Sequence, residues 1–306
     1  SLFFVVAVVG DDINPTFKVA WIIALLTLPF FGWMLYLIFG RRKISMQKQK
    51  LYRSLEKEWN GWHSNYDNTL EELKEIDGNV YKQCKFISST ANTAVFKGTQ
   101  TKFFGTGEAF FRDFKIELSR AEKFIFLEYF IINTGEMWDE IFKILKEKIV
   151  EGVEIRVFYD DLGTIQILPK DFKKQLESYG IKVCVFNPMK PSLDVFLNYR
   201  DHRKIAVIDG KVAYTGGINI ADEYVNYIER FGYWKDFAIK ISGGAVCGMT
   251  QMFLELWEFS SSRQSTNSSV YMNSYNCVND GYIMPFGAGP MNRNLTGEMA
   301  YINMLS

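Results

Sequence analysis

His202 and Lys204 lie two residues apart in a stretch with the composition of a β-strand. On a strand, such residues project from the same face. The lysine disfavours the charged imidazolium, so the nucleophilic neutral imidazole is favoured, and the ammonium can bind a phosphate oxygen. Gly216 and Gly217 allow a close backbone approach at the end of the following strand, and Asn219 adds an amide donor. This group predicts an imidazole, an ammonium and an amide that converge on an anion.

A hairpin must position these side chains. Residues 203–208 and 211–215 are strand-like, and the Asp209-Gly210 pair between them is a strong signal for a two-residue turn. A histidine–lysine pair alone is more often part of an ordinary hairpin than of a site. The chain has only two histidines. The other one, His63, lies in a polar helical segment, where we expect a surface or packing role.

Helices and strands alternate around the hairpin from about residue 103. The strands are apolar along most of their length, as in KFIFLEYFIIN at residues 123–133, which indicates burial on both faces of a sheet. The pattern predicts an α/β fold, with a mixed or parallel sheet between helices. We expect helices at residues 107–121, 137–150 and 169–179, and further strands at residues 153–159 and 181–186.

The amino-terminal part of the chain contains a long apolar run. Residues 19–39 are 21 residues without a charge, and a helix of that length spans roughly 31 Å, close to the bilayer core. Pro29 and Gly32 would kink such a helix without forbidding it. Five basic residues follow within residues 41–50, which predicts a cytoplasmic location for what comes next. We therefore expect a membrane anchor rather than a signal peptide or a buried helix. Residues 1–9, also apolar, are interpreted as the end of an earlier membrane helix.

The composition is that of a folded protein. Of 306 residues, 48% are hydrophobic and 23% charged, which excludes a disordered chain. The 35 basic and 35 acidic side chains balance, so charge gives no argument for nucleic-acid binding. The four cysteines are far apart and form no CxxC pair, which predicts reduced structural thiols rather than a zinc site or disulfides.

The full spacing from His202 to Asn219, HxKxxxxDxxxxxxGGxN, resembles the HKD motif of the phospholipase D superfamily. Further stretches resemble the bacterial cardiolipin synthases of that superfamily over almost the whole chain. They are the apolar segment ending in GRR at residues 20–42, the strands FIFLEYFIIN and GVEIRVFYDDLG, and the segment YWKDFAIKISGGAVCGMTQMFLELW. In the last segment Trp234-Lys235-Asp236 stands where a Trp-Arg-Asp triplet is usual.

The resemblance implies an enzyme that joins two phosphatidylglycerols into cardiolipin through a phosphohistidine and releases glycerol, with no metal or cofactor. The candidate catalytic residues are His202, Lys204 and Asp209. In such enzymes the motif histidine attacks phosphorus or protonates the leaving group, and the aspartate usually has an orienting or structural role. Phosphate binding is expected from Lys204, Asn219 and the Gly216-Gly217 backbone. Glu128, on the FIFLEYF strand, is a candidate supporting residue, for which a salt bridge is an equally ordinary explanation.

The motif count departs from the family pattern. These enzymes build one site from two HKD motifs, and this chain has one. Residues 279–306 resemble the opening of a second half, so we expect a piece of a longer protein, with a second copy as the other source of the missing motif. The expected parts are an anchor at 1–43, a juxtamembrane helix and connector at 44–95, the first catalytic half at 96–262, and a connector with the start of the second half at 263–306.

Other functions on the same scaffold remain open. A nuclease should have a basic groove, whereas residues 96–262 mix both signs of charge. Phospholipase D hydrolysis differs from transfer only in the acceptor, and a non-enzymatic half that binds membrane or a partner is a third hypothesis. The expected partners are phosphatidylglycerol and membrane lipid, without nucleic acid. The expected location is a cell membrane of the bacterial inner type, with the catalytic part in the cytoplasm.

Overall fold

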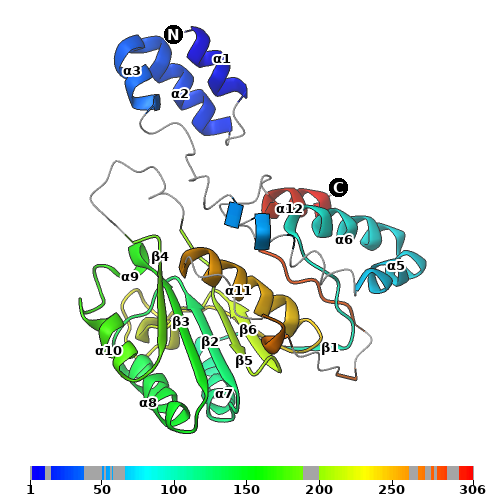
Figure 1. Ribbon diagram of the computed structural model, residues 1–306, viewed down its shortest axis with the longest axis vertical. Coiled ribbons are helices and arrows are strands. Elements are labelled where there is room, and N and C mark those ends of the chain that lie inside the picture. Colours follow the sequence, from blue (N-terminus) through cyan, green and yellow to red (C-terminus); the bar gives the residue numbers. More distant parts are fainter. Residues whose placement is uncertain are drawn as a thin grey trace. The chain divides into compact units, whose positions relative to one another are not determined.

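The structure is a computed structural model, and it divides the chain into two compact units (Figure 1). One unit comprises residues 1–50 and 189–199, and the other comprises residues 51–188 and 200–306. The residues described are 2–10, 15–37, 50–51, 53–55, 57, 66–188, 200–261, 268–272, 277–278, 281–287 and 296–305. His63, nearly all of the basic segment after residue 40, and much of the expected connector after residue 262 lie outside them.

The first unit contains three short helices, where the end of one helix at residues 1–9 and one long helix over residues 19–39 were expected. They are α1 (Leu2–Gly10), α2 (Pro15–Thr27) and α3 (Pro29–Leu35). Pro29 cannot continue a helix because it lacks an N–H and clashes with the preceding turn. The chain then folds back so closely that a Cβ on Gly32 would lie 2.3 Å from the Ala24 carbonyl oxygen. None of the helices in the described residues is both long and apolar enough to cross a bilayer. The continuous helix over residues 19–39 is therefore interrupted, and the membrane anchor stays a prediction.

The second unit is built on a seven-stranded mixed sheet with the order β1-β7-β6-β5-β2-β3-β4. Strands β2, β3 and β4 are parallel, and the other neighbours pair antiparallel. The predicted α/β class and mixed sheet are confirmed. The strands are β1 (Thr99–Phe104), β2 (Phe124–Tyr129), β3 (Glu154–Asp160), β4 (Lys182–Phe186), β5 (Ile205–Ile208), β6 (Val212–Gly216) and β7 (Ala238–Gly243).

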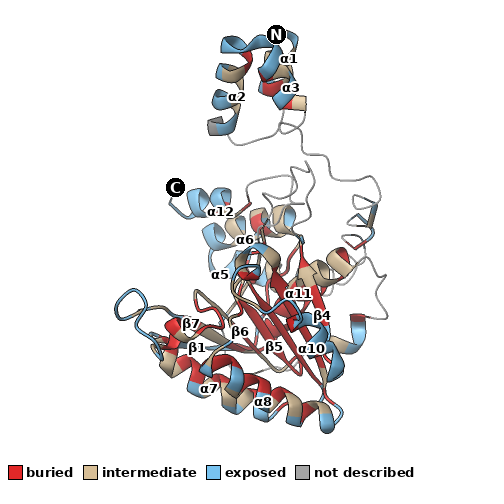
Figure 2. Cartoon of the chain, turned by 90° about the vertical axis from the view of Figure 1, so that its left-hand side faces the viewer, coloured by how far each residue is buried: buried red, intermediate tan, exposed pale blue. Residues whose placement is uncertain are grey.

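Helices cover both faces of this sheet (Figure 2). Two consecutive residues of β2 point to the two faces of the sheet. Leu127 belongs to the core shared with α7 and α8, whereas the ring of Phe126 stacks 4.7 Å from that of Phe253 on α11. Charged residues of β2 and β3 on the second face therefore lie on the side of α11. The helices here are α7 (Gly107–Ser119), α8 (Glu136–Val150), α9 (Asp161–Thr164), α10 (Phe172–Ser178) and α11 (Val246–Ser261), with short 3-10 turns η4 (Asp222–Val225) and η5 (Ser268–Tyr271).

Three more helices of the second unit come from the chain on either side of the sheet strands. They are α5 (Asp67–Ile76), α6 (Gly78–Ala91) and α12 (Thr296–Leu305). Helix α6 contacts both α5 and α12. A backbone bridge between Phe96 and Ile283 and a hydrogen bond from Thr93 Oγ1 to the Pro285 carbonyl, 2.5 Å long, tie the late segment to the chain just before β1. The predicted part boundaries at residues 95 and 262 stay predictions.

The pairing pattern brings several strand ends together. Because β5 runs antiparallel to β2, with Ile205 opposite Glu128, the start of β5 lies beside the carboxyl ends of β2 and β3. Gly216, the end of β6, pairs with Ala238, the start of β7. We call this side the His202 end of the sheet, and the side with the β5–β6 turn the Asp209 end.

Candidate active site

His202 and Lys204 lie in an extended segment just before β5, not on the strand as expected. The backbone N–H of the preceding Asp201 donates to Oδ2 of Asp160, at the end of β3, over 2.9 Å, so a contact from a distant part of the chain holds this segment. The Lys204 ammonium instead reaches back and donates to the His202 carbonyl oxygen at 2.7 Å. Lys204 is only 5% exposed, whereas His202 is exposed. The pair thus combines a buried cation with an accessible imidazole.

Phe130 is a site residue that the sequence reading missed. Its ring centroid is 4.8 Å from the His202 ring centroid and 5.4 Å from the Lys204 Nζ. It directly follows β2, so its position depends on the sheet and not on the motif spacing. The ring supports the imidazole and contributes to the dry surroundings of the ammonium.

The surroundings shift both titratable groups in the same direction. Partial burial, followed by the positive charge of Lys204, lowers the pKa of His202, while Asp201 and Asp160 act in the opposite sense. Burial lowers the pKa of Lys204 to about 8, against the opposing influence of Asp201 and Asp236. At neutral pH the imidazole is therefore mostly neutral and the ammonium mostly charged. This is the state that the sequence reading expected for a nucleophile beside an anion-binding group.

Asp236 is a second residue near the site that the sequence did not single out as a candidate. The Trp234-Lys235-Asp236 triplet was noted only for its resemblance to the Trp-Arg-Asp triplet of the family. A Cβ on Gly217 would lie 2.1 Å from Asp236 Oδ1, so the carboxylate lies directly against that glycine. It accepts from the Phe237 N–H at 2.8 Å and from Trp234 Nε1 at 3.4 Å. A Cβ on Gly216 would meet the Phe237 carbonyl oxygen at 2.3 Å. The two glycines therefore allow a close approach of the chain's own 236–238 segment.

Asn219 is buried, and its side chain forms hydrogen bonds with two neighbouring segments of the site. Its Oδ1 accepts from the Ile131 N–H at 2.9 Å, and its Nδ2 donates to the Tyr224 hydroxyl at 2.8 Å. The Ile131 bond joins the segment after β6 to the segment after β2. One hydrogen of Nδ2 is outside these two bonds. The expected phosphate contact of Asn219 stays a prediction.

The structure does not bring Asp209 to His202. The four residues of β5 separate Lys204 from Asp209, roughly 3.3 Å per residue. Oδ1 of Asp209 accepts from the backbone N–H groups of Lys123 at 2.7 Å and Phe124 at 2.9 Å, and Oδ2 accepts from that of Glu122 at 2.9 Å. The orienting, structural reading of Asp209 agrees with these contacts, and its listing as a catalytic residue stays a prediction.

The predicted turn at Asp209-Gly210 is present. Both residues have positive φ, +55° and +66°. The N–H of Lys211 donates to the carbonyl of Ile208 at 3.0 Å and closes the turn. Strand β6 then begins at Val212, which pairs with Ile208.

Glu128, on β2, contacts the site through Arg203. It is fully buried, and its Oε1 is 2.6 Å from Nε of Arg203, the residue between His202 and Lys204. Arg203 Nε is also 3.4 Å from Asp201 Oδ1. Burial raises the pKa of Glu128 well above its usual range, with Asp201 adding to the rise and Arg203 opposing it. Glu128 thus forms an ion pair with Arg203, and its supporting role in the site stays a prediction.

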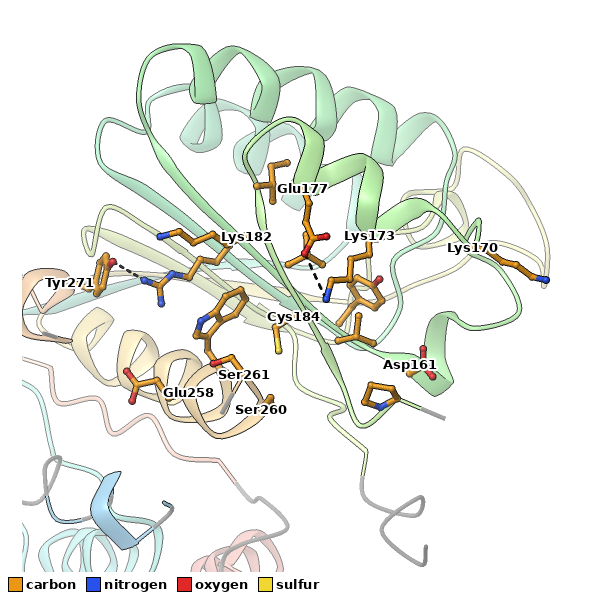
Figure 3. A pocket seen from close by; sticks show the side chains of 17 residues that line it. Asp161, Lys170, Lys173, Glu177, Lys182, Cys184, Glu258, Ser260, Ser261 and Tyr271 are labelled. Atoms are coloured by element: carbon orange, nitrogen blue, oxygen red, sulfur yellow. Dashed lines mark hydrogen bonds and ion pairs between the residues drawn. The ribbon is translucent and has the colours of Figure 1, made fainter. Parts of the chain in front are cut away.

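A separate pocket of about 1040 Å³ lies along β4, between α10 and the end of α11 (Figure 3). Neither His202 nor Lys204 lines it. Two lysines at its wall are engaged with carboxylates, in the pairs Lys173–Glu177 at 3.7 Å and Lys182–Glu154 at 2.8 Å. The candidate site is therefore at the His202 end of the sheet and not in this pocket.

Comparison with known families agrees with the motif. Residues 1–41 match the family model described as Phospholipase_D-nuclease N-terminal, and residues 114–229 match the one described as Cardiolipin synthase, PLD-like domain. The second match includes His202, Lys204, Asp209 and Asn219. The resemblance read from the sequence is thereby confirmed.

Curated relatives align with nearly the whole chain. An uncharacterized protein of Streptococcus mutans is 38% identical over 308 aligned residues, covering 99% of this chain and 66% of its own length. A cardiolipin synthase of Halalkalibacterium halodurans is 30% identical, covering 100% of this chain and 61% of its own length. The solved phosphatidylserine synthase of Haemophilus influenzae has a TM-score of 0.45 at 15% identity, with 62% of this chain and 46% of that chain covered.

The chain spans somewhat less than two thirds of the length of these curated relatives. Within that span the motif, the helix-flanked mixed sheet and the family models agree with one another. Residues 114–229 form a PLD-like domain of the cardiolipin synthase type, the part of the chain that carries its likeness to the phospholipase D superfamily.

Proposed function

We propose that this chain carries one HKD motif of a phosphatidyltransferase that converts two phosphatidylglycerols into cardiolipin and glycerol. The observation that carries the proposal is the exposed His202 imidazole above the buried Lys204 ammonium, within residues that match a cardiolipin synthase domain. A nucleophile must be accessible and uncharged, and a phosphate-binding cation is strongest where water is excluded. The two residues meet these requirements at one point of the surface.

The reaction needs two displacements at phosphorus. In the first, the neutral imidazole of His202 forms a P–N bond, and the P–O bond to the head-group glycerol breaks. A histidine from a second motif gives the leaving oxygen its proton. In the second, a hydroxyl of another phosphatidylglycerol returns a proton to that histidine and attacks phosphorus, and the P–N bond breaks. Two phosphatidylglycerols thus give one cardiolipin and one glycerol, and the balance is the same if the two histidines exchange roles.

The neighbouring residues have distinct proposed tasks. Lys204 binds a non-bridging phosphoryl oxygen, and its bond to the His202 carbonyl keeps the cation beside the imidazole. Asn219 completes the oxygen-binding group through its remaining Nδ2 hydrogen. Of the expected Gly216-Gly217 contribution, the Gly217 N–H already donates to the Phe237 carbonyl, so what the two glycines provide is room for the 236–238 segment beside the site. Asp236 acts electrostatically on Lys204, because it favours the charged ammonium. Glu128 supports the segment through Arg203.

The proposed place of action is a membrane. The match of residues 1–41 to the amino-terminal family model and the apolar run at residues 19–39 support membrane association. The basic residues after the run favour a cytoplasmic catalytic part. The second HKD motif comes from the rest of a longer protein or from a second copy. Phosphatidylglycerol is the proposed substrate, and nucleic acid is not a proposed partner.

The test follows cardiolipin and free glycerol in phosphatidylglycerol vesicles. It compares this chain alone with a version joined to a second HKD half, each as His202→Ala and as the matched control His63→Ala. We expect product from a form with two motifs, lost in His202→Ala and kept in His63→Ala. Undiminished product from His202→Ala would refute the role of His202. Phosphatidic acid in place of cardiolipin would assign hydrolysis instead of transfer.

A further inference from the structure

Large apolar side chains are exposed around the His202 end of the sheet. In the loop between η4 and β7, Phe231 is 68% exposed, Tyr233 60% and Phe237 48%. Leu162 and Ile165, just after β3, are 47% and 48% exposed. Large apolar side chains are unfavourable in water, so two exposed groups of them at the same end of the sheet indicate an interaction surface.

This apolar rim brackets the candidate site. Phe103 at the end of β1 is 66% exposed, and its ring stacks 5.9 Å from that of Phe237, just before β7. Phe237 also accepts a backbone hydrogen bond from Gly217 at 3.1 Å. On the other side, Leu162 donates its N–H to Asp160, the carboxylate that also holds Asp201. His202 therefore lies between two exposed apolar groups.

The loop that carries Phe231 is held in shape. Asn226 accepts from the Trp234 N–H at 2.7 Å and donates to the Trp234 carbonyl at 3.0 Å, closing the loop at its neck. The same Asn226 side chain donates to Glu108, which also accepts from the Tyr233 hydroxyl at 3.1 Å. The exposed loop leads into β7 and projects beside β1 (Figure 2). With the neck of the loop held in this way, the Phe231 ring lies 6.1 Å from that of Trp234 and still remains mostly exposed, as does Tyr233.

We infer that this rim, made of Phe103, Leu162, Ile165, Phe231, Tyr233 and Phe237, docks the His202 end of the sheet on the surface of a phospholipid bilayer. The inference rests on the proposed function, because a phospholipid's phosphate must reach His202 while its acyl chains stay in the membrane. A rim of aromatic and aliphatic side chains around an anion-binding group meets both demands. Phenylalanine enters the boundary between headgroups and acyl chains, and tyrosine keeps its hydroxyl at the wet level.

The experiment places a fluorine probe at one rim position of the full chain in phosphatidylglycerol bilayers. Trifluoromethylphenylalanine replaces Phe231 in one sample and Val150 in the matched control. Val150 is 89% exposed at the end of α8 and is followed by the start of β3, so it lies toward the Asp209 end. Relaxation of the ¹⁹F signal is measured with dissolved oxygen, which concentrates in lipid, and with a water-soluble nickel chelate. We expect at least threefold more relaxation by oxygen than by nickel at position 231, and the reverse at position 150.

Each other outcome contradicts the inference. Equal nickel access at positions 231 and 150 would place the rim in water. Protection of position 231 from both reagents would place it against protein, such as a second copy or a second catalytic half. The measurement needs no turnover, so it is separable from the proposed function. Cardiolipin synthesis with position 231 in water would refute only the docking, and a lipid-embedded position 231 without cardiolipin synthesis would refute only the function.

Discussion

The residues of the motif have different surroundings at the two ends of strand β5. At the His202 end, Lys204 is buried with its pKa lowered to about 8, and the imidazole beside it is exposed. At the Asp209 end, the carboxylate accepts three backbone N–H groups and is 2% exposed. The first end leaves one imidazole exposed to solvent, whereas the second uses its carboxylate entirely within the fold.

This difference explains why the motif spacing is long. The four-residue strand between Lys204 and Asp209 links a reactive segment to a turn that is fixed to the start of β2. Because β2 also carries Glu128, the ion-pair partner of Arg203, the same strand supports both ends. The motif thus includes both the candidate site residues His202 and Lys204 and the residue Asp209, which fixes the following turn to the sheet.

The largest effect expected from this comparison is on His202. Replacing it with alanine should lower turnover at least about 10³-fold, because it removes the proposed nucleophile or acid. The stability of the fold should change by no more than about 0.5 kcal/mol, since the side chain is exposed. Product formation and thermal unfolding, measured on the same sample, check both parts. A large loss of stability in His202→Ala would mean that the two ends are not divided as described.

Asp209→Ala should have the opposite pattern, with a large loss of stability and little change in turnover. It leaves three backbone N–H groups without their acceptor, which should lower the free energy of unfolding by about 3 kcal/mol. Turnover per folded molecule should stay close to that of the unchanged chain. The matched control is Glu122→Ala, which removes an exposed carboxylate near the same turn, 3.2 Å from Lys211. We expect no measurable change in Tm for that control. If Asp209→Ala kept full stability but lost turnover, the carboxylate would have a direct part in the chemistry.

The pH dependence of kcat/KM should separate the two ends further, because above the pKa of Lys204 kcat/KM should fall about tenfold per pH unit. Lys204 must be charged to bind a phosphoryl oxygen, so kcat/KM should fall as the pH rises through about 8. The pKa of His202 is lowered, so its neutral form should persist below the usual histidine range on the acid side. In Lys204→Arg the cation does not titrate, and the alkaline fall should disappear even where the plateau is lower. An alkaline fall that persists in Lys204→Arg would assign it to another group.

The sequence predicts best where the signal is local. The Asp209-Gly210 turn depends on two adjacent residues that tolerate positive φ, and it is present as expected. The alternating pattern similarly placed α7 and α8 within one or two residues of their observed ends. The helix expected over residues 19–39 is instead interrupted at Pro29, a local signal that the hydropathy outweighed.

The sequence predicts least where distant segments decide. The segment before β5 lacks the expected strand structure, and it is held by the Asp160 carboxylate, 41 residues earlier, which accepts from the Asp201 N–H. Phe130 and Asp236 reach the site only through the pairing of β2 with β5 and of β6 with β7. A motif read along the chain cannot show such neighbours. The Trp234-Lys235-Asp236 triplet was the available signal for Asp236.

The smallest expected effect concerns the attachment of Asn219 at the His202 end. Tyr224→Phe removes the hydroxyl that accepts from Asn219 Nδ2 and should lower stability by about 1 kcal/mol. Because Asn219 is also held by the Ile131 N–H, it should stay near its place, and kcat/KM should fall only a fewfold. The matched control is Tyr227→Phe, which removes a hydroxyl bonded to Glu140 at 2.8 Å on an exposed side chain. A loss of turnover in Tyr224→Phe as large as in His202→Ala would mean that the hydroxyl takes part in the reaction. The His202 end would then extend from the motif into η4, and the division between reactive and structural groups would pass through Asn219 itself.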